Sequence, residues 1–157
     1  MSGSSAPQRD VVGVASVLAD ALPALYRALD RRVARDFPHP KPPEGHLNLL
    51  RYVAEHEGAT VRQAAEALLM KPNNVSALVS QLTGQGLLER RHDSTDKRIV
   101  RLHLTPVARR RLAEVHALHV GHLTGVLRAL TDGELDALGS ALGALVSLTH
   151  GLRAAQH

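Results

Sequence analysis

Cationic side chains gather in one short polar segment, which contains Arg90, Arg91, Lys97, Arg98 and Arg101. Such side chains bind phosphate oxygens through charge-assisted hydrogen bonds. Just upstream lies a segment rich in short hydrogen-bonding side chains: Asn73, Asn74, Ser76, Ser80 and Gln81. Amide side chains pair well with adenine edges, and hydroxyls pair with several bases. The two segments together indicate a surface that binds nucleic acid.

The short polar side chains need a helix to present them on one face. Val75, Leu78, Val79 and Leu82 recur at the spacing of an apolar helix stripe, so we expect a helix over residues 72–83, with Lys71 before it as a phosphate contact. Pro72 suits the first helical position, and glycines follow the last one. Two shorter helices are expected before it, over residues 46–56 and 60–69. Thr60 and Gln63 have the spacing of a capping box at the start of the second.

The cationic segment is predicted to form a β hairpin. Residues 87–91 and 98–104 are expected to be strands, because apolar and polar side chains alternate in the second of them. The turn between them contains Asp93 and Asp96, which we expect to accept backbone amides or to pair with arginines. Three helices followed by a hairpin predict a winged helix-turn-helix, with Arg90 and Arg91 either on DNA or bracing the wing.

Helical patterns flank this lobe on both sides. We expect a disordered tail over residues 1–9, an N-terminal dimerisation helix over 10–37 and a proline-rich linker over 38–45. The winged helix-turn-helix lobe would cover residues 46–104, and two C-terminal dimerisation helices residues 105–157. The outer helices have leucine faces that a small monomer could not wholly bury. The expected fold is therefore mainly α, with a two-stranded β wing and dimerisation helices at both ends.

From about Leu47 to Arg111 the sequence resembles the MarR family (multiple-antibiotic-resistance regulators). The wing of that family usually reads Asp-x-Arg-Asp-x-Arg, followed by an alternating strand and Leu-Thr-x-x-Gly. Asp93, Asp96 and Arg98 match the first pattern, and Leu104 and Thr105 match the second. Thr95 stands where the wing-tip arginine is usual, with Lys97 as the nearest substitute. Ala108 or Arg109 stands where the glycine is usual.

The resemblance implies an effector-responsive repressor that binds a pseudo-palindromic operator in double-stranded DNA as a homodimer. It also implies a small-molecule pocket between the dimer helices and the DNA-binding lobe. We expect His46, His116 and His119 to line this pocket and to hold a small aromatic or anionic effector. Two alternatives remain: a winged-helix module that binds a protein, and a zinc-responsive regulator of the same fold.

Composition excludes several other classes of function. The 157 residues include ten histidines but no cysteine, so disulfides and thiolate zinc sites are excluded. The histidines lack the spacing of a metal site, and we expect no metal and no cofactor. No nucleophile–base motif, phosphate-binding glycine loop or useful carboxylate pair is present, so no enzyme is expected. Without a secretory signal or an apolar stretch of ~18 residues, we expect a cytoplasmic protein with no membrane partner.

Overall fold

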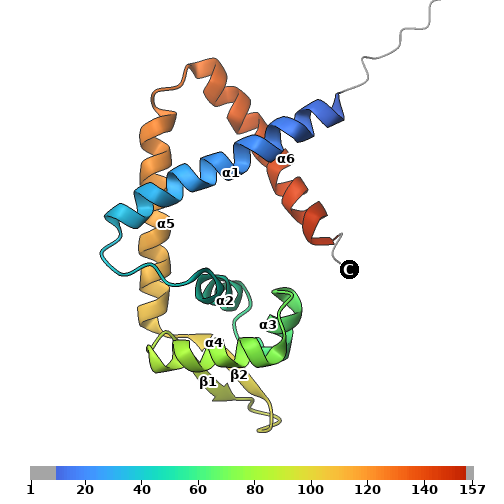
Figure 1. Ribbon diagram of the computed structural model, residues 1–157, viewed down its shortest axis with the longest axis vertical. Coiled ribbons are helices and arrows are strands. Elements are labelled where there is room, and N and C mark those ends of the chain that lie inside the picture. The colour runs from blue at the N-terminus through green and yellow to red at the C-terminus, as the bar shows by residue number, and fades with distance from the viewer. Residues whose placement is uncertain (1–9, 155–157) are drawn as a thin grey trace, which may run out of the picture. The chain divides into compact units, whose positions relative to one another are not determined.

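The computed structural model describes residues 10–154, so the tail expected over residues 1–9 lies outside the described part. Figure 1 shows a mainly helical chain with one two-stranded antiparallel sheet. The elements are α1 (Val11–Asp36), α2 (Glu44–Glu55), α3 (Val61–Ala67), α4 (Pro72–Gly84), β1 (Leu88–His92), β2 (Val100–Leu104), α5 (Pro106–Leu127) and α6 (Asp132–Ala154). They form two compact units, one up to His119 and one from Val120 onward.

The first unit contains the predicted winged helix-turn-helix. Helices α2, α3 and α4 pack on one another and on the hairpin around a shared core. The expected stripe of α4 lies in that core, since Val75, Val79 and Leu82 are fully buried. Leu88 and Leu102 bring the hairpin into the same core. The fold class is therefore confirmed, and the apolar periodicity of α4 locates its buried face.

The hairpin has two distinct faces. Leu88 pairs with Leu104, Arg90 with Leu102, and His92 with Val100, so these side chains share one face. Glu89, His103, Arg91 and Arg101 share the other. β2 begins two residues later than the sequence predicted, because residues 97–99 belong to the turn: Ile99 N donates to Asp96 O, and Asp93 N donates to Ile99 O. β1 has the predicted length but is displaced by one residue toward the turn.

Helices α3 and α4 end in the same way, but with different residues at the critical position. After α4, Gly86 has a φ of 69°, and Leu87 N donates to Leu82 O. After α3, Leu69 takes the equivalent place with a φ of 53°, and Met70 N donates to Ala65 O. This left-handed conformation is easy for glycine and strained for a residue with a β-carbon. The turn before α4 therefore stores strain at Leu69.

Replacing Leu69 by glycine is expected to stabilise the protein by roughly 0.5–1 kcal/mol, because relief of the strain outweighs the added chain entropy. Leu69 is 75% exposed, so little apolar burial is lost. Chemical denaturation measures the change, and Leu69→Ala is the matched control because its β-carbon keeps the strain. Equal stability of the two variants would show that the left-handed turn costs nothing.

Helices α1 and α6 have exposed apolar faces in the single chain. Val33 is the only buried residue of α1, and α6 has none within the described residues. By length and composition both helices could cross a membrane, so the expectation that no stretch approaches this limit was wrong. The large apolar residues of these helices are interspersed with alanine, glycine and serine, so neither helix contains one continuous run of large apolar residues. An apolar helix of this kind can also pack on another helix, and the predicted lack of a membrane partner stays a prediction.

Candidate nucleic-acid interface

The polar face of α4 is open to solvent. The side chains of Asn73, Asn74 and Ser76 are exposed, and none of them has a hydrogen-bond partner among residues 10–154. Helix α4 has no charged side chain. Its buried face fixes the orientation of the helix on the lobe, so the free amides and hydroxyl lie on a rigid support. Such a surface can donate hydrogen bonds to base edges and accept them, without a charge that binds phosphate indiscriminately.

The other two predicted base-reading residues already have partners within the chain. Ser80 Oγ donates to Ser76 O at 3.0 Å and accepts from Arg90 Nη2 at 2.8 Å. Gln81 Oε1 accepts from His46 Nε2 at 2.8 Å, which ties α4 to α2. Asn73, Asn74 and Ser76 are therefore the available part of the predicted set, and Ser80 and Gln81 also position the helix.

The wing turn is braced by the two aspartates, as the sequence predicted. Asp93 Oδ1 accepts from the amides of Thr95 (2.8 Å) and Asp96 (3.1 Å), and its Oδ2 pairs with Arg101 Nε. Asp96 Oδ1 accepts from the amide of Arg98 at 3.0 Å. The two amides, and then the guanidinium of Arg101, lower the pKa of Asp93 to about 2. This carboxylate therefore stays ionised, and the turn stays braced, until the pH falls toward that value.

The wing cations differ in how freely they can bind DNA. Arg101 Nη1 donates to Gly58 O at 3.0 Å, and Arg91 pairs with Glu89 at 2.8 Å, both on the hairpin face away from Arg90. Arg98 pairs with Asp96 but is 91% exposed, so little holds it there. Lys71 and Lys97 have no ion pair or hydrogen bond from their side chains among the described residues.

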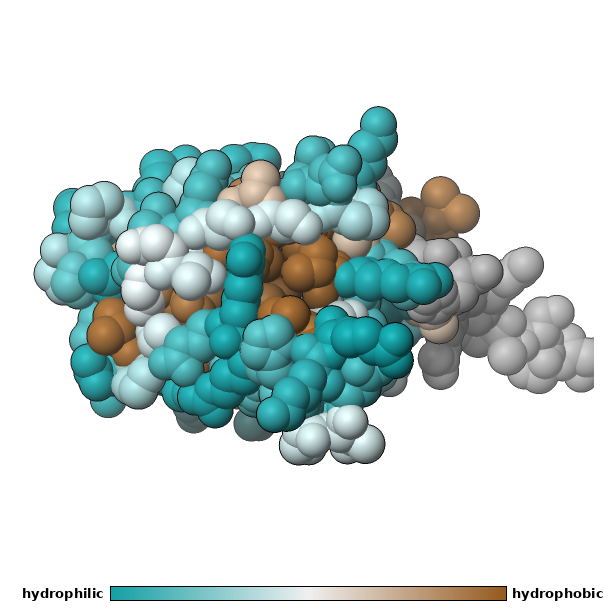
Figure 2. All heavy atoms as spheres, turned by 90° about the horizontal axis from the view of Figure 1, so that it is seen from below, coloured by the Kyte–Doolittle hydropathy of each residue, from teal (hydrophilic) through white to brown (hydrophobic). Residues whose placement is uncertain are grey.

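Arg90 acts as a brace between the wing and α4, one of the two roles left open for it. Figure 2 views this end of the first unit and shows many hydrophilic side chains around a few exposed apolar ones. Of the predicted wing contacts, Arg90 lies on the hairpin face that meets α4, whereas Arg91 and Arg101 lie on the opposite face.

Glu57 joins the hairpin to the start of α5. Its carboxylate accepts from His103 Nδ1 at 2.9 Å and from Arg109 Nη2 at 2.9 Å. Partial burial alone would raise the pKa of Glu57, but the hydrogen bonds from Arg109 and His103 outweigh it and lower that pKa. Arg109 therefore supplies an ion pair that ties the start of α5 to the segment after α2.

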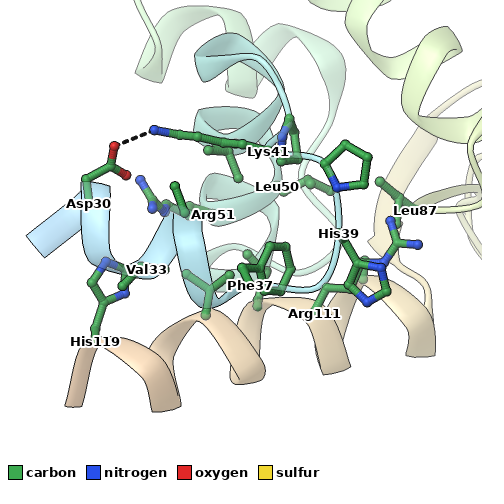
Figure 3. Close-up of a pocket in the computed structure, with 17 residues that line it drawn as sticks. Asp30, Val33, Phe37, His39, Lys41, Leu50, Arg51, Leu87, Arg111 and His119 are labelled. Carbon is green, nitrogen blue, oxygen red and sulfur yellow. Dashed lines mark hydrogen bonds and ion pairs between the residues drawn. The ribbon is translucent and has the colours of Figure 1, made fainter. Parts of the chain in front are cut away.

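A cavity of about 60 Å³ lies within the first unit, between the end of α1, the proline-rich linker, α2 and α5. Its walls are mostly apolar and include Val33, Phe37, Leu50 and Leu112. This volume is enough for a few water molecules. Figure 3 shows Phe37 in the middle of the view, with charged side chains toward both ends.

Two arginines of this cavity lack a partner. Lys41 Nζ pairs with Asp30 at 2.5 Å, and His39 Nε2 lies 3.8 Å from Glu114. Arg51 and Arg111 also line the cavity, but neither makes an ion pair or a hydrogen bond within residues 10–154. Neither arginine was predicted from the sequence to be a site residue. The residues that line the cavity with them come from distant segments of the chain, so no local pattern indicates that they lie together. An unpaired guanidinium beside an apolar wall favours a ligand with a negative charge.

The three histidines predicted to line an effector pocket lie in different places. His119 lines the cavity, whereas His46 and His116 do not. His46 is buried, and its ring is hydrogen-bonded to Gln81 of α4 instead. The described residues contain no group of three or more side chains placed to hold a metal ion. The predicted absence of metal and cofactor stays a prediction.

The winged-helix lobe has a recognisable relationship to known proteins. Residues 41–99 match the model of the MarR family, which confirms the resemblance seen in the sequence. No curated protein matches the chain with significance.

Solved structures share the fold over most of the chain. A MarR family protein from Bacillus stearothermophilus superposes with a TM-score of 0.73 at 20% identity, over 93% of this chain and 99% of that one. FabT of Streptococcus pneumoniae, solved in complex with DNA, gives 0.67 at 18% identity, over 87% and 98%. MepR of S. aureus, solved bound to ethidium bromide, gives 0.64 at 17% identity, over 83% and 95%. At these identities the likeness establishes the fold.

Proposed function

We propose, because residues 41–99 match the MarR family model, that this chain is a sequence-specific DNA-binding regulator of transcription. One observation carries this proposal: the side chains of Asn73, Asn74 and Ser76 are exposed and have no hydrogen-bond partner within residues 10–154, beside a wing that its own aspartates hold in place. The α4 side chains would read bases in the major groove, and Lys71, Lys97 and Arg98 would contact phosphates. FabT, a protein of the same fold, has been solved in complex with DNA.

We propose that the active form is a homodimer and a repressor that works in the cytoplasm. The exposed apolar faces of α1 and α6 would be covered by a second copy of the chain. Two copies would place two α4 helices on successive major grooves, about 34–36 Å apart, and so favour a pseudo-palindromic site. A dimer on such a site would block access of the polymerase. The lack of catalytic activity expected from the sequence stays a prediction.

The direct test measures binding of the protein to the intergenic DNA upstream of its own gene. Fluorescence anisotropy reports this binding over a range of salt concentrations. A scrambled duplex of equal length and composition is the control. We expect one dimer per site and a preference for the natural sequence that persists at physiological salt. Equal binding of both duplexes that collapses with salt would instead favour a winged-helix module that binds a protein.

We further propose that an anionic effector with a small aromatic ring binds the cavity of the first unit. The apolar wall would hold the ring, and Arg111, at one end of the cavity, would bind the charge. MepR, a protein of the same fold, has been solved bound to ethidium bromide. The cavity includes the end of α1 and the linker as well as α2 of the lobe. A ligand there that prefers one arrangement of these segments would shift the protein toward it.

Benzoate, as the smallest aromatic carboxylate, is the probe for this cavity. Its affinity is expected to fall roughly 10–100-fold in Arg111→Gln, because one charge-assisted hydrogen bond is lost. Isothermal titration calorimetry measures this change, and Arg110→Gln is the matched control, since Arg110 does not line the cavity. Benzyl alcohol should bind both proteins equally weakly. Equal benzoate affinity in the two variants would refute the anionic effector without touching the DNA-binding proposal.

A further inference from the structure

His92 ends β1 on the hairpin face that also presents Arg90. Side chains two residues apart on a strand point to the same face. Arg90 reaches Ser80 of α4 from this face, so it is the side of the wing that looks toward the base-reading helix. His92 lies one step further toward the wing tip and is exposed. A phosphate of DNA held by both α4 and the wing would pass close to it.

One ring nitrogen of His92 is hydrogen-bonded within the wing. Its Nδ1 lies 2.7 Å from Lys97 O, and a carbonyl oxygen can only accept, so Nδ1 carries a proton and donates it. The remaining nitrogen, Nε2, has no partner among the described residues. In the neutral ring Nε2 is an acceptor and repels a phosphate oxygen. In the protonated ring Nε2 becomes a donor with a positive charge. The bond to Lys97 O therefore makes phosphate binding by His92 depend on a single proton.

The charged groups around His92 favour this role. Helix α4 has no charged side chain, so the neighbouring charges come from the hairpin. Asp93 and Asp96 already accept turn amides and arginines. The hairpin also has Glu89, which pairs with Arg91, and Arg98 and Arg101 pair with Asp96 and Asp93. Five cations therefore stand against three acids, and a bound phosphate would add negative charge where cations are in excess.

We propose that His92 is a further DNA-backbone contact that binds phosphate only when protonated, so that DNA binding takes up one proton at each wing. This inference rests on the proposed function. Histidine titrates near neutral pH, and a phosphate beside the ring raises the pKa of the bound form above that of the free form. Affinity is then greatest at low pH and falls as the pH rises between the two pKa values. Linkage sets the limit at about tenfold per pH unit per wing.

The experiment measures affinity for a duplex between pH 6 and 8 at constant ionic strength, for the full-length wild type, His92→Gln and His56→Gln. Glutamine cannot take up the proton. His56 is exposed at the end of α2, stacks on Tyr52 and has no side-chain hydrogen bond or ion pair to the hairpin among the described residues, so it controls for the loss of a histidine. We expect wild type and His56→Gln to lose affinity with rising pH, and His92→Gln to show a flatter profile. Imidazole signals of His92 in NMR should titrate at a higher pH with DNA than without.

Each outcome decides the proposal. A His92→Gln profile parallel to that of wild type, with no shift of the His92 titration on adding DNA, overturns the proton-linked contact while DNA binding itself stands. Failure of the wild type to bind any duplex at any pH overturns the proposed function, and this inference with it. As a second variant, His92→Arg keeps a cation at all pH values, so it should bind tightly with a flat profile.

Discussion

Replacing Leu142 by aspartate is expected to convert the protein into monomers. Leu142 lies at the middle of an exposed stripe on α6 and is 60% exposed in the single chain. The other members of this stripe are Leu135, Leu138, Val146 and Leu152. A second copy that covers the stripe would enclose the new carboxylate without a partner, which costs several kcal/mol at each of the two symmetric positions. Analytical ultracentrifugation reports the change in mass.

The same substitution should remove most of the affinity for operator DNA. A dimer binds its second half-site as an intramolecular event, which raises the overall affinity about 10²–10⁴-fold over one half-site alone. Ser140→Asp is the matched control, because Ser140 lies about 200° around α6 from Leu142 and is also exposed to solvent. A Leu142→Asp protein that remains dimeric would show that α6 is not covered by a second copy.

Replacing Asn74 by alanine should relax base preference rather than weaken binding to every sequence. Asn74 is exposed on α4 and has no partner within the described residues, so its amide is free for one base edge in each half-site. A bidentate contact contributes about 1–3 kcal/mol of discrimination, so the preference for operator over scrambled DNA should fall roughly 5–150-fold per half-site. Anisotropy titrations with both duplexes give this ratio.

Arg98→Ala provides the contrast to Asn74→Ala. Arg98 is held only by a solvent-exposed pair with Asp96, so it can turn to a phosphate. Its loss should weaken binding to operator and scrambled DNA alike, and should reduce the slope of log K against log salt by about one per protomer. If both variants bind operator as the wild type does, with the same salt slope, α4 and the wing do not form the DNA-binding surface.

Much of the fold follows from local sequence patterns. The stripe of Val75, Val79 and Leu82 identifies α4, and the capping box of Thr60 and Gln63 is present at the start of α3. Asp93 and Asp96 brace the wing turn as their positions predicted. These features depend on residues within a few positions of one another, where the period of a helix or the geometry of a turn fixes which groups meet.

The state of individual site residues depends on segments that are far apart in the chain. Gln81 appears on the polar face of α4, but its oxygen is bound by His46, 35 residues away. Ser80 meets Arg90 across the lobe, and Arg101 meets Gly58 O, 43 residues away. Sequence periodicity separates the apolar face of an element from its polar face. It does not tell which polar side chains of that element will meet a polar side chain of a neighbouring element.

The cavity illustrates the same limit. The sequence indicated its histidines by type alone, and the structure placed only His119 of those three on its wall. Arg51 comes from α2 and Arg111 from α5, and each looks like an ordinary surface cation in its own helix. The sequence by itself determined the elements, their buried faces and the charged wing, because these depend on near neighbours. Only the tertiary packing decided which polar groups form hydrogen bonds or ion pairs with one another and which remain available for a ligand or DNA.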